Sequence, residues 1–285
     1  MSKGNDATRT DASPYEGEVD PKTMKIVVFV KFVPDAQSDR GFGSDDRVDR
    51  SVDGLLSELD EYPLEQALQI VEDAGDGEVV AVTMGPEDAS DAVRKSLQIG
   101  ANSGVHIVDD GLAGTDAAGT SLVLARAVEK IAEDGPVDLV LTGIASTDGG
   151  SSVVPAQVAE RLGWPQVTFA STCEVADGVV RIRRDGDVSS ETVEASLPAV
   201  VSVTDLINEP RYPSFKGIMK AKKKPVAEWS LDDLGIDAGQ VGVGGAWTRV
   251  ERITERPART AGEVVADEGD GGNALIEFLA GRKLV

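Results

Sequence analysis

The sequence has few of the residues that disulfides, metal sites and nucleophilic catalysis need. Among 285 residues there are one cysteine, Cys173, and one histidine, His106. An internal disulfide is therefore impossible, and zinc sites and Cys-His nucleophilic chemistry are excluded in practice. His106 lies in the apolar run 104–108 and is expected in a strand rather than at a metal. No paired catalytic groups emerge, so we expect no covalent chemistry from this chain alone.

Positive charge is also scarce. The chain has 28 Lys and Arg against 50 Asp and Glu, a net charge of −22. Phosphate backbones attract surplus basic residues, so nucleic acid is disfavoured as a partner, and so is a membrane surface. The acids are spread along the chain, which is typical of a halophile-like solvated surface rather than of a patch for a cationic partner.

Long apolar runs are missing. No run approaches the roughly 18 residues of a membrane helix, so membrane insertion is not expected. The first residues lack the apolar core of a secretory signal, and with the single cysteine this predicts a cytoplasmic protein. Residues 1–23 are polar and aperiodic and are expected to form a disordered acidic tail, with Met24 as an alternative start.

From Met24 onward, strand-like runs alternate with helical periodicity. Strands are expected at 25–33, 78–83, 104–108 and 137–142, with helices around 64–71, 93–97 and 121–132. This alternation is typical of βαβ units and predicts an α/β fold, doubly wound around a mostly parallel sheet.

The pattern changes after Gly163. Strands at 166–170, 178–184, 191–196 and 199–204 follow one another without helices and are expected as antiparallel additions to the sheet edge. Beyond Pro225 the apolar residues are too few for a separate core. We therefore expect an α/β nucleotide-binding domain over residues 24–225 and a C-terminal extension over 226–285 that packs on a partner subunit.

The loop 143–155 follows a buried strand and precedes a helix, a place where open α/β sheets bind ligands. Gly149 and Gly150 would let the backbone approach a phosphate, Ser151 and Ser152 would donate hydroxyl groups, and the helix N-terminus offers free N–H groups. The alternative is a solvated βα loop. The loop has no Lys, which disfavours a P-loop, and no G-x-G-x-x-G follows the first strand.

Residues 208–224 form a proline-punctuated run that holds five lysines and displays Tyr212 and Phe215. Basic and aromatic residues concentrated in a loop are typical of a contact surface. The alternatives are that Phe215 is buried against its own sheet and that the lysines are a solvated charge run.

Several blocks in order support a family assignment. They are residues 25–34, 60–67, 85–86, 99–101, 164–168, 197–200, 208–211 and 260–273. This set resembles the electron transfer flavoprotein beta subunits, with the last block similar to the actinobacterial branch and the acidity similar to a haloarchaeal protein.

The resemblance implies a fold similar to the adenine-nucleotide alpha-hydrolases and a heterodimer with an FAD-carrying alpha subunit. Such heterodimers accept electrons from dehydrogenases, typically acyl-CoA dehydrogenases, and pass them to a quinone oxidoreductase. The beta subunit usually holds a structural AMP. Two alternatives are a bifurcating flavoprotein half, with a second FAD in place of AMP and NADH as donor, and a stand-alone nucleotide-binding stress protein. The long segment after Pro225 disfavours the last.

The resemblance also assigns residues. AMP contacts carry over to Phe29, Ser57, Asp60, Met84, Gly143, Asp148, Gly149, Gly150, Ser151, Ser152, Val153 and Val154. Docking of the dehydrogenase carries over to Tyr212, Phe215, Ile218, Met219 and Lys220. Asp185 takes the place of an acid that restrains the flavin domain, or else it is an ordinary hairpin-turn acid. The loop departs from the family at Gly150, Val153 and Pro155, and Ser57-Glu58 replaces the usual Asn-Pro.

Overall fold

A computed structural model describes residues 24–35, 41–43, 46–254, 256–257, 262 and 264–285. The expected tail 1–23 lies outside the described residues. The chain divides into two compact units, Met1–Val250 and Glu251–Val285, which are considered separately.

The first unit is built on a nine-stranded sheet with the strand order β11-β5-β4-β1-β6-β10-β7-β8-β9. Its strands are β1 (Met24–Phe29), β4 (Gly77–Met84), β5 (Ser103–Ile107), β6 (Leu139–Gly143), β7 (Gln166–Ala176), β8 (Val179–Asp185), β9 (Ser190–Ser196), β10 (Ala199–Val203) and β11 (Val226–Trp229). A small antiparallel pair, β2 (Phe32–Pro34) and β3 (Gly54–Leu56), stands apart. His106 lies in β5, as expected.

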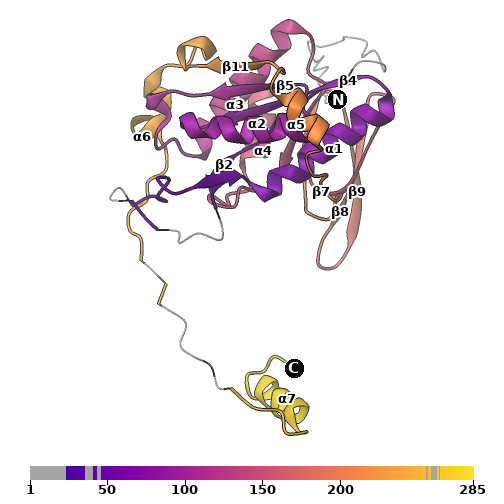
Figure 1. Ribbon diagram of the computed structural model, residues 1–285, viewed down its shortest axis with the longest axis vertical. Coiled ribbons are helices and arrows are strands. Elements are labelled where there is room, and N and C mark those ends of the chain that lie inside the picture. The colour runs from indigo at the N-terminus through magenta and orange to yellow at the C-terminus, as the bar shows by residue number, and fades with distance from the viewer. Residues whose placement is uncertain (1–23, 36–40, 44–45, 255, 258–261, 263) are drawn as a thin grey trace, which may run out of the picture. The chain divides into compact units, whose positions relative to one another are not determined.

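Helices cover both faces of the sheet (Figure 1). In this unit the longer ones are α1 (Glu58–Ala74), α2 (Ser90–Ile99), α3 (Ala117–Ile131), α4 (Val154–Leu162) and α5 (Phe215–Ala221). Alternate residues of β1 enter different cores: Ile26 packs with the residues of α1 and α2, whereas Val27 packs with those of α3 and α4. The prediction of a doubly wound, mostly parallel α/β sheet is confirmed.

Short elements complete the chain. They are η1 (Glu87–Ala89), η2 (Asp110–Leu112), η3 (Ala132–Asp134), η4 (Asp232–Leu234), η5 (Ala238–Gln240) and α6 (Gly242–Gly245). The helix α7 (Gly271–Gly281), of 11 residues, belongs to the second unit. Of the helices in the described part of the chain, none is long and apolar enough to cross a membrane.

The placement of β10 differs from expectation. It was expected to be an antiparallel addition, which is wrong: β10 lies inside the sheet between β6 and β7 and runs parallel to both. All five of its residues are buried, as a strand covered on both faces requires. Within the nine-stranded sheet, only the β7–β8 and β8–β9 pairings are antiparallel.

The α/β unit extends past Pro225, where the extension was expected to begin. β11 pairs in parallel with β5 at one edge of the sheet. Leu231, Leu234, Ile236 and Val241 are buried in the same core as α3. A few apolar residues are enough here because they complete an existing core. That the segment beyond packs on a partner stays a prediction.

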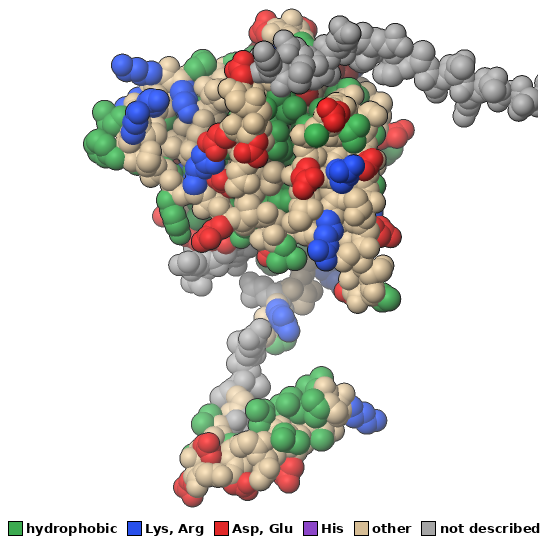
Figure 2. Space-filling view, turned by 90° about the vertical axis from the view of Figure 1, so that its right-hand side faces the viewer, with side chains coloured by type: hydrophobic (Ala, Val, Ile, Leu, Met, Phe, Trp, Pro, Cys, Tyr) green, Lys and Arg blue, Asp and Glu red, His purple; other side chains and the backbone are tan. Residues whose placement is uncertain are grey.

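The second unit contains α7, whose apolar side chains are exposed. Figure 2 shows hydrophobic side chains gathered on one side of this unit. The exposed large apolar residues of this unit include Leu275, Ile276, Phe278 and Leu284. On the face of the first unit drawn in the same figure, Asp and Glu side chains are scattered rather than gathered in one block.

Candidate functional site

The candidate site lies where the strand order reverses. From β1 the chain proceeds through α1 to β4 on one side, and β6 later enters on the other side of β1. Loops leaving the carboxyl ends of β1 and β6 start at this reversal, and open α/β sheets bind ligands in the crevice at such a point. The first loop begins near Lys31 and the second is residues 144–153, directly before α4.

Asp148 connects these two loops. Its carboxylate, only 2% exposed, accepts a hydrogen bond from Lys31 Nζ at 2.9 Å and pairs with the guanidinium of Arg50. Burial opposes ionisation of Asp148, but the charges of Lys31 and Arg50 outweigh it and lower the pKa to about 2. The crevice thus holds two cations around one permanently ionised acid.

Asp60 is a second buried acid at the same edge. Its carboxylate accepts a hydrogen bond from the backbone N–H of Lys31 at 2.8 Å. Burial raises the pKa of Asp60 to about 7, although the backbone hydrogen bond and the charge of Lys31 act against the rise. Gly143 is required beside it, since a Cβ there would lie 2.5 Å from the carbonyl oxygen of Leu59.

The glycine-serine loop contains two residues with a left-handed backbone. Gly150 and Ser152 have φ of 58° and 54°, in the left-handed region. The N–H of Gly150 donates to Ser146 O at 3.0 Å, and that of Gly149 to Ser146 Oγ at 3.2 Å. Gly149, Gly150, Ser151 and Val153 are exposed. Left-handed residues within such loops turn successive N–H groups toward one side, where an anion can bind.

Two hydroxyl groups near this edge lack partners. Ser57 Oγ and Thr83 Oγ1 are fully buried and make no hydrogen bond. Ser57 precedes α1 but its side chain does not cap the helix. An unsatisfied buried hydroxyl costs about 1–3 kcal/mol, so a bound ligand that pairs with Ser57 would remove a penalty.

The remaining expected contacts lie at the ends of neighbouring strands. Phe29 ends β1, and Met84 ends β4 beside it. Phe29 is buried in the core on the α3 and α4 face. Val154 begins α4, one residue before the helix start expected at Pro155.

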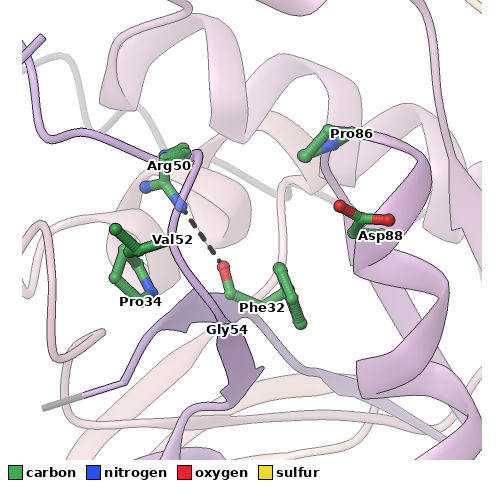
Figure 3. A pocket seen from close by; sticks show the side chains of 7 residues that line it. All are labelled: Phe32, Pro34, Arg50, Val52, Gly54, Pro86 and Asp88. Carbon is green, nitrogen blue, oxygen red and sulfur yellow. Dashed lines mark hydrogen bonds between the residues drawn. The ribbon is translucent and has the colours of Figure 1, made fainter. Parts of the chain in front are cut away.

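Sequence reasoning missed Lys31 and Arg50. The loop itself has no cation, and both arrive from the segment between β1 and α1. Figure 3 shows Arg50 donating to the carbonyl of Phe32 at 3.4 Å, beside a hollow of about 10 Å³. Its other lining residues are Pro34, Val52, Gly54, Pro86 and Asp88. That volume holds about one water, so any nucleotide would bind outside it. The available signal was Lys31, directly after the first strand.

The segment 208–224, named here the docking segment, is not wholly a loop: it contains the helix α5. Tyr212 and Phe215 are 93% and 82% exposed, so Phe215 is not buried against its own sheet. Ile218 and Met219 are also exposed, and Lys220 lies in the last turn of the helix. The role of these residues in docking stays a prediction.

Asp185 ends β8 and stabilises the hairpin with β9. Its carboxylate accepts hydrogen bonds from Ser171 Oγ and Ser190 Oγ, both at 2.5 Å, and these lower its pKa. Asp185 also lines an open hollow of about 380 Å³ at the carboxyl ends of β6 and β10. The hollow is further lined by Ile144, Phe169, Arg184, Gly186, Ser189, Glu191 and Thr204. These contacts account for a hairpin role, while a role between domains stays a prediction.

Comparison with known proteins places this architecture in one family. The electron transfer flavoprotein domain matches residues 47–234. The electron transfer flavoprotein subunit beta of Mycobacterium leprae is 46% identical over 266 residues, covering 91% of this chain and 99% of the relative. That of Megasphaera elsdenii is 31% identical, covering 92% and 100%. A subunit of the caffeyl-CoA reductase-Etf complex of Acetobacterium woodii is 33% identical, covering 85% and 92%.

Proposed function

The chain belongs to the electron transfer flavoprotein family as a beta subunit, and from this premise we propose that it binds a structural AMP in the crevice between β1 and β6. In the proposed heterodimer an alpha subunit carries FAD, the group that takes up and releases the electrons. This chain contributes the nucleotide site and the docking surface. It is an electron-transfer subunit rather than an enzyme with a substrate of its own.

The ion cluster of Lys31, Arg50 and Asp148 is the observation that carries the nucleotide proposal. In a chain with a net charge of −22, this crevice holds two cations against one fully ionised acid. Asp60 adds less than a full negative charge near neutral pH, because its pKa is about 7. A phosphate would therefore meet a locally positive site.

The residues present suit a nucleoside monophosphate. Lys31 and Arg50 would hold the phosphate, and the backbone N–H groups of Ser151 and Ser152 would donate to its oxygens, since those of Gly149 and Gly150 already donate to Ser146. A Cβ at Gly149 would lie 3.2 Å from Ser146 Oγ and 3.7 Å from Lys31 Nζ, so a larger side chain there would occupy the space beside Lys31. The buried hydroxyl of Ser57 would gain a partner.

The ligand content of the purified heterodimer tests the proposal. We expect one FAD and one AMP per heterodimer. Gly149→Val, which adds a side chain beside Lys31, should lose the AMP and keep the FAD. Two FAD would favour the bifurcating alternative, for which the relationship to the caffeyl-CoA reductase-Etf subunit is the supporting observation. Stoichiometric AMP in Gly149→Val would contradict this site.

The rest of the proposed function concerns electron flow. The heterodimer would accept electrons from flavin dehydrogenases, typically acyl-CoA dehydrogenases, through docking at Phe215 and its exposed neighbours. It would deliver them to a quinone oxidoreductase. Exposed aromatic residues amid lysines support docking, because a buried ring supplies affinity while charges steer encounter.

A further inference from the structure

The docking segment displays large apolar side chains to solvent, yet polar contacts hold its two ends on α1 and α2. Tyr212 and Phe215 are its two most exposed large apolar residues. Because these rings are exposed, packing in a core does not fix their position. Other contacts of the segment must fix it.

At the first end, Arg211 binds two carboxylates of α1. Its Nε and Nη2 donate to the two oxygens of Glu65 at 2.7 and 2.9 Å, and its Nη1 and Nη2 donate to Glu72 at 2.6 and 2.9 Å. The side chain of Glu65 is only 5% exposed and also accepts from the backbone N–H of Arg211. Asn208 adds a hydrogen bond from its amide to the carbonyl of Tyr62 at 3.0 Å.

Bidentate pairing fixes orientation as well as distance. Because Arg211 forms two such pairs with residues two helical turns apart, its backbone is held at one position along α1. Removing Arg211 would also leave Glu65 as a buried unpaired acid, which is strongly unfavourable.

At the other end, Lys224 binds the C-terminus of α2. Its Nζ donates to the carbonyl oxygens of Leu97 and Gly100, both at 3.0 Å, and of Ala101 at 2.5 Å. Carbonyls at a helix C-terminus have no partners within the helix, and a cation there complements the helix dipole. The neighbouring Lys223 is exposed.

Between these ends, α5 lies close against α2, as Figure 1 shows. A Cβ at Gly217 would lie 2.6 Å from the carbonyl oxygen of Gln98, so only glycine allows this approach. Ser214 caps α5 by accepting from the N–H of Gly217 at 3.0 Å. The helix is short, and its order depends on these contacts rather than on its own length.

We infer that Arg211 and Lys224 are positioning residues that hold the docking segment in its binding conformation, through α1 at one end and α2 at the other. This inference rests on the proposed function of the segment. A rigid segment loses less conformational freedom when a partner binds, so its affinity is higher. The dehydrogenase would contact Phe215 and Tyr212, while Arg211 and Lys224 would act through them.

Three variants of the heterodimer test the inference. Glu65→Gln/Arg211→Met removes the charges of Arg211 and Glu65, so that no unpaired buried acid is left, while Glu72 is exposed and can be solvated. Lys224→Met removes the second contact. Lys223→Met is the matched control, because it deletes the same charge one residue away.

We expect faster hydrogen exchange at residues 209–221 in the first two variants, and a dissociation constant for acyl-CoA dehydrogenase raised about tenfold. Lys223→Met should change neither by more than about twofold at physiological salt. Adding Phe215→Ala to Lys224→Met should weaken binding less than the two single effects predict, because both act through Phe215.

Unchanged exchange in both variants would overturn the inference, and so would equal effects of Lys223→Met and Lys224→Met. Suppose that Phe215→Ala weakens binding, but that the Arg211 and Lys224 variants exchange faster and bind with unchanged affinity. This result would overturn the positioning role and leave the docking function intact. If Phe215→Ala itself has no effect on affinity, the proposed docking function fails. The exchange measurement would still report whether the segment is held.

Discussion

The ammonium of Lys31 lies 2.9 Å from the carboxylate of Asp148, across 117 positions of sequence. The pair joins the loop after β1 to the loop after β6 at the point where the strand order reverses. It brings a cation to a glycine-serine loop that has none of its own.

Lys31→Met should weaken AMP retention by about ten- to a hundredfold, because a charge-assisted hydrogen bond contributes about 1.5–3 kcal/mol. Nucleotide released from the heterodimer during dialysis would be measured by chromatography. Arg126→Met is the control, since Arg126 is an exposed cation on α3 that pairs with Glu129, in the same helix. Equal retention in Lys31→Met and the control would contradict a phosphate at Lys31.

The pH dependence of stability should reflect Asp60. Its folded pKa is about 7, above the value of about 3.9 in an unfolded chain, so between these values the folded state holds a proton that the unfolded state lacks. Stability from this group is therefore full at low pH and is lost as pH rises toward 7. Asp148 acts in the opposite direction but only at acid pH, since its folded pKa is about 2.

Asp60→Asn removes this dependence. Between pH 5 and 7 the free energy of unfolding of the wild type should fall relative to that of the variant, by up to about 1.4 kcal/mol per pH unit. Urea unfolding at several pH values would measure the two slopes. Only the slopes are compared. The asparagine side chain would have one acceptor oxygen where Asp60 has two, so the absolute free energy of unfolding of the variant will differ from that of the wild type. Parallel slopes would show that Asp60 is ionised throughout this range.

Much of this architecture could be predicted from periodicity in the sequence. Where the prediction was wrong, the reason is physical. The continuous apolar run of β1 and the spacing of Leu64 and Leu68 predict a buried strand and a helix with one apolar face, and both are present. The run of β10 directly follows β7, β8 and β9 without a helix between them, and only the sheet order shows that it pairs with β6 inside the sheet. Local patterns do not encode strand order.

Only part of the candidate site could be predicted, because part of it is brought together by tertiary packing. The loop 143–154 has a local signal in its glycines and serines, and the structure places it at the expected edge of the sheet. Lys31 and Arg50 lie about a hundred residues away and reach the loop only through tertiary packing. In the docking segment the prolines predicted a loop, but contacts to α2 stabilise α5, and no local pattern reports those contacts.

Deleting residues 251–285 should separate folding from assembly. The α/β unit ends at Val250, and its buried residues Leu234, Ile236 and Val241 are retained in this truncation. Its melting temperature should therefore change little. Affinity for the alpha subunit should fall more than tenfold, about 1.4 kcal/mol or more, because the apolar residues of α7 would no longer cover the partner.

Gel filtration and titration with the purified alpha subunit would measure that affinity. A double substitution Leu275→Ala/Phe278→Ala provides a milder variant that keeps the chain length. Unchanged affinity and unchanged flavin retention in the truncated heterodimer would rule out assembly through this segment.

Phe215→Ala should raise the dissociation constant for the dehydrogenase about thirtyfold, equivalent to about 2 kcal/mol at a strong interface residue. The flavin content and the melting temperature of the heterodimer should stay nearly constant, because the ring is 82% exposed. Val188→Ala is the control, since Val188 is an equally exposed apolar residue at the tip of the β8–β9 hairpin.

Lys222→Ala separates charge from contact at the same surface. Lys222 is exposed and follows α5 directly, so its loss should slow association mainly at low ionic strength, where charge steering is least screened. Electron-transfer rates measured against dehydrogenase concentration at two salt concentrations would give both effects. An unchanged half-saturating concentration in Phe215→Ala, or an equal rise in Val188→Ala, would show that the dehydrogenase binds elsewhere.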